Sequence, residues 1–167
     1  TSIKYGVTRD HVLQIRGILS DGSRVFFGPL DSSALRQKLT LPTREGDIYR
    51  FIQKQLSNPD IQHRIHQHYP KPSIHRRNTG YALDALLQMQ PFTPDGPPFN
   101  LSSLLCGSEG TLAFTTEITL SLDPLPPAHE VLVCGHFESI GDSMKAVLTA
   151  MEHHPYACEL MDRLVLD

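Results

Sequence analysis

Residues 106–111 (CGSEGT), here called the glycine loop, combine residue types that suit a ligand-binding turn. Gly107 and Gly110 permit backbone angles that a Cβ would forbid, and they leave the main chain open to a ligand. The backbone N–H groups of such a loop can converge on an anion, and Ser108 and Thr111 add hydroxyl groups. A plain β-turn before a strand has the same composition, so the spacing alone leaves both interpretations open.

The residues after the glycine loop alternate and are rich in Thr, Ile and Phe as far as Leu120, which predicts a strand. Residues 107–127 (GSEGTLAFTTEITLSLDPLPP) resemble the signature of FAD-linked oxidases of the vanillyl-alcohol-oxidase type, which usually reads GSEGTLG before a TEATL-like strand. Three further blocks follow the order of that family: KYGVT at 4–8, with a strand and Asp21-Gly22 after it, RRNTGY at 76–81, and CELMD at 158–162. The resemblance covers most of the chain except roughly residues 31–74.

The resemblance implies an α+β fold. Residues 1–124 are then the second half of a PCMH-type FAD-binding domain, an antiparallel sheet with helices and a helical insertion at residues 31–74. Residues 125–167 are then the beginning of the substrate, or cap, domain, and the breaker-rich segment DPLPP at 123–127 marks the boundary.

By the same resemblance, the full-length parent is an FAD-dependent oxidoreductase that oxidises a small D-2-hydroxy acid of the D-lactate, glycolate or D-2-hydroxyglutarate class. The hydride would pass from the substrate Cα to the flavin, since a bound cofactor carries the redox chemistry and the protein positions it. The implied parent is a bacterial flavoprotein fused to an iron–sulfur domain, so an iron–sulfur cluster is expected elsewhere in it.

The chain lacks an initiator Met, and it resembles a fragment. Its expected partners are the missing N-terminal half of the FAD domain and the remainder of the cap domain. We expect the fragment alone to bind FAD weakly or not at all and to be inactive. The alternative is a non-catalytic structural or interaction module of the same ancestry.

The resemblance assigns the cofactor contacts mainly to the main chain of the glycine loop and of the strand after it. The candidates are Thr1, Ser2, Tyr5, Gly6, Gly107, Ser108, Glu109, Gly110, Thr111, Leu112, Ala113, Phe114 and Thr115. Ala113 stands where the family usually has Gly. The RRNTGY block adds Arg76, Arg77 and Asn78 as candidates near the flavin or a substrate carboxylate, with a helix cap and two exposed cations as the alternative. No residue of the chain matches a catalytic motif.

Composition indicates which class of protein and which cellular location to expect. A hydrophobic content of 40% and a charged content of 20% are typical of a soluble globular protein. The net charge of −3 gives no reason to expect nucleic acid as a partner. No apolar run approaches the roughly 20 residues that a membrane-spanning helix needs. We expect a cytoplasmic location, with peripheral attachment to the inner membrane left open. The three widely spaced cysteines, Cys106, Cys134 and Cys158, suit small buried residues better than a disulfide framework.

Hydrophobic spacing predicts the elements that position these residues. Strands are expected over 11–20 and 23–27, joined by an Asp21-Gly22 turn, and again over 130–137. Helices are expected over 34–39, 45–56, 82–87, 101–105 and 139–151. Residues 61–69 are expected to form a short helix or a turn segment, and no element is expected over 1–6. Asn78 or Thr79 is the expected cap of the helix at 82–87, and Asn100 that of the helix at 101–105.

His63 and His66 are three residues apart in the insertion and can share a helix face. A metal site and a solvated polar face both explain this pattern. We favour the solvated face, because no Cys or carboxylate completes a ligand set with a recognised spacing.

Overall fold

A three-stranded antiparallel sheet and a set of helices build the chain, and the α+β class is confirmed. The computed structural model describes residues 2–71, 73–74 and 80–166. They fall into two compact units. One unit, Thr8–Leu122, contains the sheet, and the other consists of Thr1–Val7 with Asp123–Asp167.

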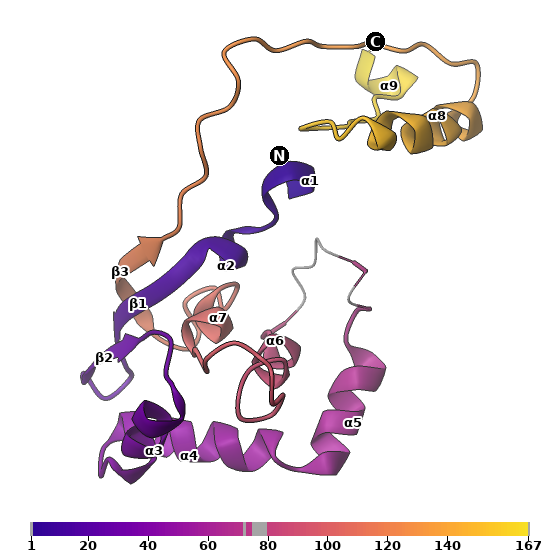
Figure 1. Cartoon of the computed structure of the whole chain (residues 1–167). Helices are drawn as coiled ribbons and strands as arrows, with labels where there is room; N and C mark the ends of the chain where they lie inside the picture. Colours follow the sequence, from indigo (N-terminus) through magenta and orange to yellow (C-terminus); the bar gives the residue numbers. More distant parts are fainter. Residues whose placement is uncertain (1, 72, 75–79, 167) are drawn as a thin grey trace. The chain divides into compact units, whose positions relative to one another are not determined.

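The sheet has the order β2-β1-β3, with β1 (Val12–Ile18) between β2 (Arg24–Phe27) and β3 (Phe114–Leu120) (Figure 1). Both pairings are antiparallel. Residues on one face of β1 and β2 are buried, as period-two alternation requires: Ile15, Gly17, Val25 and Phe27. The three strands expected in this part of the chain are confirmed.

The turn between β1 and β2 is built as its Asp-Gly sequence predicts. Gly22 has a φ of +82°, in the left-handed region that favours glycine. The Asp21 carboxylate accepts hydrogen bonds from the Ser23 amide at 2.9 Å and from the Ser23 hydroxyl at 2.6 Å. The turn therefore fixes the register in which Ile18 faces Arg24.

Strand β3 lies at the edge of the sheet, and all seven of its residues are exposed. Its register places Ile118 opposite Ile15 and Phe114 opposite Ile18. Ile15 is 3% exposed, whereas Ile118 is 51% exposed. Helices therefore cover the β1 and β2 part of this face, and in the described part of the chain nothing covers β3.

The insertion expected at residues 31–74 is helical. It contains α3 (Ser32–Thr40), α4 (Arg44–Leu56) and α5 (Pro59–His68). Each helix begins after a side chain that caps it: the Asp31 carboxylate, the Thr43 hydroxyl and the Asn58 carbonyl accept from first-turn amides. The expected helices at 34–39 and 45–56 are confirmed, and the helical alternative for 61–69 is confirmed by α5.

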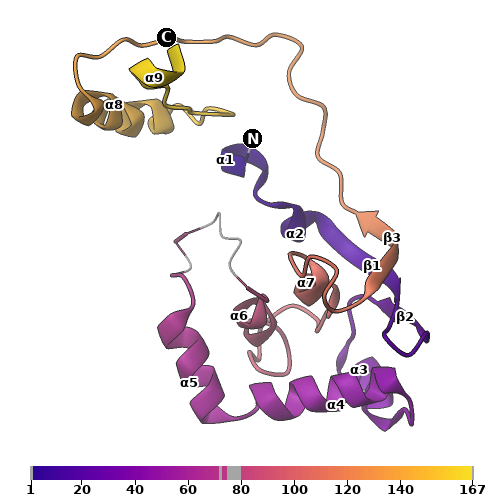
Figure 2. The same ribbon diagram turned by 180° about the vertical axis from the view of Figure 1, so that it is seen from behind.

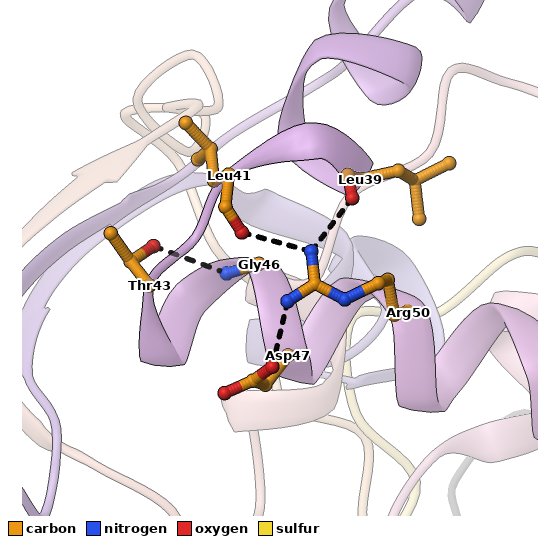
Figure 3. A network of polar contacts seen from close by, with 6 residues as sticks. All are labelled: Leu39, Leu41, Thr43, Gly46, Asp47 and Arg50. Atoms are coloured by element: carbon orange, nitrogen blue, oxygen red, sulfur yellow. Dashed lines mark hydrogen bonds and ion pairs between the residues drawn. The ribbon is translucent and has the colours of Figure 1, made fainter.

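A hydrogen-bond network centred on Arg50 joins the end of α3 to the start of α4 (Figure 3). Arg50 Nη1 donates to the carbonyls of Leu39 at 2.7 Å and Leu41 at 2.8 Å, and Nη2 donates to the Asp47 carboxylate at 2.7 Å. Carbonyls at a helix C-terminus lack intrahelical donors, so a cation there stabilises the end. The network leaves no room beside Gly46, where an added Cβ would collide with the Leu41 carbonyl.

The core of this unit lies between the sheet and the insertion. Three aromatic rings form its centre, with centroid distances of 6.2 Å from Phe27 to Tyr49 and 6.2 Å from Tyr49 to Phe99. Tyr49 and Phe27 are each 1% exposed. The insertion is thus part of the same hydrophobic core as the hairpin.

Two short helices, α6 (Leu83–Leu87) and α7 (Ser102–Leu105), connect the insertion to the glycine loop. In both views α7 lies between β1 and α6 (Figures 1 and 2). The N-cap residue of α6 is Ala82, and no side chain caps this helix among the residues that the structure describes. Asn78 and Thr79, the expected caps, lie outside those residues.

The second unit holds α1 (Ser2–Tyr5), α8 (Ile140–Glu152) and α9 (Arg163–Leu166). The Ser139 hydroxyl caps α8 by accepting from the Asp142 amide at 3.1 Å. Tyr5 packs on Tyr156 with a centroid distance of 5.8 Å, and Lys4 Nζ lies 5.3 Å from the same ring. The helix expected at 139–151 is confirmed.

Three expectations need correction. Residues 130–137 are irregular, because in the described part of the chain no neighbouring strand offers them backbone partners. Cys134, in that segment, is consequently exposed, whereas Cys106 and Cys158 are partly buried, and all three are free thiols. The first residues form two helical turns, α1 and α2 (Thr8–His11), where no helix was expected.

Among the described residues, no helix is long and apolar enough to cross a membrane.

Candidate functional site

The glycine loop follows α7 directly and turns the chain toward β3. Its backbone is left-handed at three positions, with φ of +84° at Gly107, +51° at Glu109 and +75° at Gly110. Glu109 is unusual, because a residue with a Cβ pays roughly 1–2 kcal/mol to adopt this conformation. Strained positions of this kind cluster where a binding site requires them.

Two carbonyls of the glycine loop already have protein donors. Arg9 Nη2 donates to the Cys106 carbonyl at 2.9 Å. The Ser108 carbonyl accepts from the Thr111 amide at 3.0 Å and from the Thr111 hydroxyl at 2.6 Å. Ser108 itself is 5% exposed, so the loop presents main chain rather than this hydroxyl.

Three amides of the same loop have no partner. The N–H groups of Gly107, Glu109 and Gly110 find no acceptor among the described residues. Consecutive amides around left-handed residues form a concave set of donors that suits an anion or other oxygen acceptors of a ligand. An added Cβ at Gly110 would meet nothing within 4 Å, so the space beside this amide is open.

Arg9 occupies the opposite side of the loop. Its Nη2 would lie 3.2 Å from a Cβ added to Gly107, so guanidinium and glycine are in close contact. Burial raises the pKa of the Cys106 thiol above its usual value, and the charge of Arg9 acts in the opposite direction. The raised pKa keeps Cys106 in its thiol form, which is a poor nucleophile.

Asn100 ties the approach to the loop to the sheet. Its side-chain amide donates to the Leu13 carbonyl of β1 at 2.9 Å, and its carbonyl accepts from the Ser102 amide at 3.0 Å. The second contact is the expected cap-like interaction, although α7 begins at Ser102, one residue later than predicted. Asn100 is 8% exposed, so both bonds are shielded from water.

Tyr81, the last residue of the RRNTGY block, lies against the glycine loop. Its hydroxyl is 2.8 Å from the Thr111 hydroxyl, and its own carbonyl accepts from the Tyr69 hydroxyl at 2.9 Å. The structure thus brings together three positions that the sequence keeps apart: the end of α5, Tyr81 and the glycine loop.

The other candidate residues fall into three groups. Leu112 and Ala113 are partly buried and pack against the core, and Phe114 and Thr115 begin β3. Ser2, Tyr5 and Gly6 belong to the second unit, and Gly6 has a φ of +72°. Thr1, Arg76, Arg77 and Asn78 lie outside the described residues.

The histidine-rich α5 gives no metal site in the part of the chain that the structure describes, where no three His, Cys, Asp or Glu side chains gather. A cavity of about 170 Å³ lies between α3 and Gln90, lined by Leu35, Arg36 and Gln53. None of the residues that line this cavity belongs to the glycine loop.

Sequence reasoning missed Arg9 and the Leu13 end of the Asn100 contact. Arg9 lies 97 residues before Cys106, and Leu13 lies 87 residues before Asn100. Arg9 directly follows the KYGVT block, and this position is the one feature of the sequence that draws attention to it. The position does not indicate which distant residue Arg9 contacts.

Known proteins resemble this chain over nearly its whole length. It is 36% identical to a D-2-hydroxyglutarate dehydrogenase of Pseudomonas putida and 30% identical to one of Escherichia coli, each over 166 residues. Each match covers 99% of this chain and 15% of the relative. Glycolate oxidase subunit GlcD of Escherichia coli is 42% identical over 72 residues, which are 42% of this chain and 14% of that protein.

No family model and no solved structure matches the chain. The chain spans about 15% of the length of the D-2-hydroxyglutarate dehydrogenases that it matches. The similarity nevertheless includes both the glycine loop and the segment that carries Arg9, since it leaves out only 1% of the chain. This similarity to dehydrogenases and oxidases of 2-hydroxy acids agrees with the resemblance to FAD-linked oxidases that the sequence motifs indicate.

Proposed function

We propose that this chain contributes FAD-binding main chain to an oxidoreductase that acts on a D-2-hydroxy acid. The observation that carries the proposal is the glycine loop. In it the carbonyls of Cys106 and Ser108 are held by the protein, and the amides of Gly107, Glu109 and Gly110 have no acceptor among the described residues. Such fixed donors suit the oxygens and ring nitrogens of a dinucleotide, because they need no reorganisation on binding.

The residues present fit such a cofactor. The space beside Gly110 is open, so a ligand can approach the main chain there. Ala113, which replaces the usual Gly, packs against the core, so its methyl group faces away from solvent. Leu112 also packs inward, and we propose that residues 107–115 present their backbone groups to the nucleotide end of FAD.

We assign the remaining parts by the same proposal. The Thr8–Leu122 unit would be the second half of a PCMH-type FAD-binding domain, and residues 125–167 would begin the cap domain. Tyr5 and Gly6 would line the flavin near its pyrophosphate. Bound FAD would supply the hydride acceptor, and the contribution of this chain would be to hold and orient it.

The proposed substrate class is a small D-2-hydroxy acid, and D-2-hydroxyglutarate is the first candidate. The name D-2-hydroxyglutarate dehydrogenase belongs to the relatives that match 99% of the chain, whereas the glycolate oxidase subunit matches 42% of it. An iron–sulfur cluster elsewhere in a longer parent is part of the proposal.

A chimaera tests the proposal. The chain would replace the aligned 166 residues of the Pseudomonas putida dehydrogenase, and flavin absorbance and dye reduction with D-2-hydroxyglutarate, D-lactate and glycolate would be measured. We expect a yellow protein that retains one FAD per chain. A second chimaera that exchanges only the Thr8–Leu122 unit guards against a failed junction. A folded chimaera that purifies without flavin would refute the proposal.

A further inference from the structure

We propose that Arg9 and Tyr81 are positioning residues that hold the glycine loop from two sides and so orient the amides of Gly107 and Glu109. The inference rests on the proposed function, since it assigns a purpose to the geometry of that loop. Neither residue is itself offered as a cofactor contact. Each acts on a carbonyl of the loop, Arg9 directly and Tyr81 through Thr111.

Arg9 acts on the first carbonyl. Its Nη2 donates to Cys106 O at 2.9 Å and fills the space beside Gly107. Its Nε is buried and has no acceptor among the described residues. In that part of the chain the guanidinium therefore donates to the Cys106 carbonyl, and its rigid planar group fixes the direction of this carbonyl.

Tyr81 acts on the second carbonyl through a hydroxyl relay. The Thr111 hydroxyl donates to Ser108 O at 2.6 Å, and a hydroxyl has one proton to donate. The Tyr81 hydroxyl, 2.8 Å away, must therefore donate to Thr111 Oγ1. The order Tyr81 to Thr111 to Ser108 aligns the dipoles, which strengthens each bond in the series.

The same relay reaches back to the insertion. The Tyr69 hydroxyl, at the end of α5, donates to the Tyr81 carbonyl at 2.9 Å. Tyr69, at the end of α5, thus helps to fix the position of Tyr81. Arg9 is positioned by α2, which leads directly into β1. The Cys106 carbonyl shares a peptide plane with the Gly107 amide, and the Ser108 carbonyl shares one with the Glu109 amide. Holding both carbonyls therefore holds these two amides in one direction.

Two substitutions remove these contacts while preserving most of the packing. Tyr81→Phe deletes one hydroxyl, and Arg9→Met keeps the apolar stem without its donors. Tyr49→Phe and Arg24→Met are the matched controls: the buried Tyr49 hydroxyl has no partner among the described residues, and Arg24 is exposed on β2.

The first readout is amide hydrogen exchange of the full 167-residue chain without FAD. We expect the Thr111 amide to exchange about fivefold faster or more in Tyr81→Phe and in Arg9→Met, as the loss of one hydrogen bond implies. The Ile15 amide in the sheet should exchange as in the wild type. A role limited to global stability would instead accelerate both amides together, and that result would overturn the inference, as would unchanged Thr111 exchange.

The second readout is FAD affinity in the chimaera of the proposed function. We expect each substitution to weaken FAD binding by about fivefold to tenfold, and neither control to change it. Equal affinity in all variants would overturn the inference and leave the proposed function intact. Absence of FAD from the unsubstituted chimaera would refute the proposed function, and hydrogen exchange in the isolated chain would still decide the positioning role.

Discussion

Arg9 donates a hydrogen bond to the carbonyl of Cys106 across 97 residues of sequence, at 2.9 Å. The contact joins the segment before the first strand to the turn before the last strand of the sheet. Its consequence is that Gly107 has a neighbour, whereas Gly22 and Gly110 have open space where a Cβ would be. The glycines of this chain therefore differ in what a side chain would cost.

Gly107→Ala should destabilise the fold more than Gly22→Ala. Both glycines have nearly the same left-handed φ, +84° and +82°, so the backbone cost of about 1–2 kcal/mol is shared. Only at Gly107 would the Cβ also press on Arg9, at 3.2 Å. We expect an excess of about 1 kcal/mol in the free energy of unfolding, measured in urea. Adding Arg9→Met should remove the excess, and an equal cost at both positions would contradict the contact.

Gly46→Ala should cost about 2 kcal/mol or more, although alanine favours helices. Gly46 lies in the first turn of α4, where a Cβ would collide with the Leu41 carbonyl that Arg50 holds. Gly141→Ala in the first turn of α8 is the control, since its Cβ would meet only the Ser139 hydroxyl at 3.6 Å. There we expect a gain of about 0.5–1 kcal/mol from helix propensity. Thermal unfolding followed by circular dichroism separates the two cases.

Tyr49 should make the fold sensitive to alkaline pH. Burial first, and then the charge of Glu45, raises the pKa of this phenol above its usual range. The folded state therefore keeps the proton that the unfolded state releases near pH 10, so stability is complete below pH 10 and falls above it. The slope contributed by one group is at most about 1.4 kcal/mol per pH unit.

The comparison with Tyr49→Phe isolates this effect. The Tyr49 hydroxyl is buried and lacks a partner within the described residues, so its removal at pH 8 should be neutral or slightly stabilising. Urea unfolding at pH 8, 10 and 11 should show a smaller loss in the variant than in the wild type. Parallel losses would mean that Tyr49 ionises freely in the folded state.

The isolated 167-residue chain should bind FAD only weakly and show no turnover. The glycine loop offers three free amides, and a few hydrogen bonds barely offset the entropy lost on association. Fluorescence quenching of FAD should give no saturation below roughly 0.1 mM. A sample that purifies yellow and reduces a dye with D-2-hydroxyglutarate would contradict this prediction.

Local sequence determined much of the fold. The Asp21-Gly22 turn, the alternation in β1 and β2, the caps Asp31 and Asn58, and the apolar spacing of α4 and α8 each depend on neighbours within a few residues. Such short-range preferences can be read from a single sequence. The resemblance of GSEGTLA to a family signature likewise needed only contiguous residues.

Tertiary structure decided the rest, because it concerned partners far away in the chain. The apolar residues 131–133 look like a strand, yet a strand forms only beside another strand. Ser108 looks like a ligand-facing hydroxyl and is buried. Arg9 and Tyr81 meet at the glycine loop, and Asn100 ties the segment before that loop to β1, because of where β1, α5 and α7 pack. These contacts join residues 30 to 97 positions apart, so they leave no local pattern in the sequence.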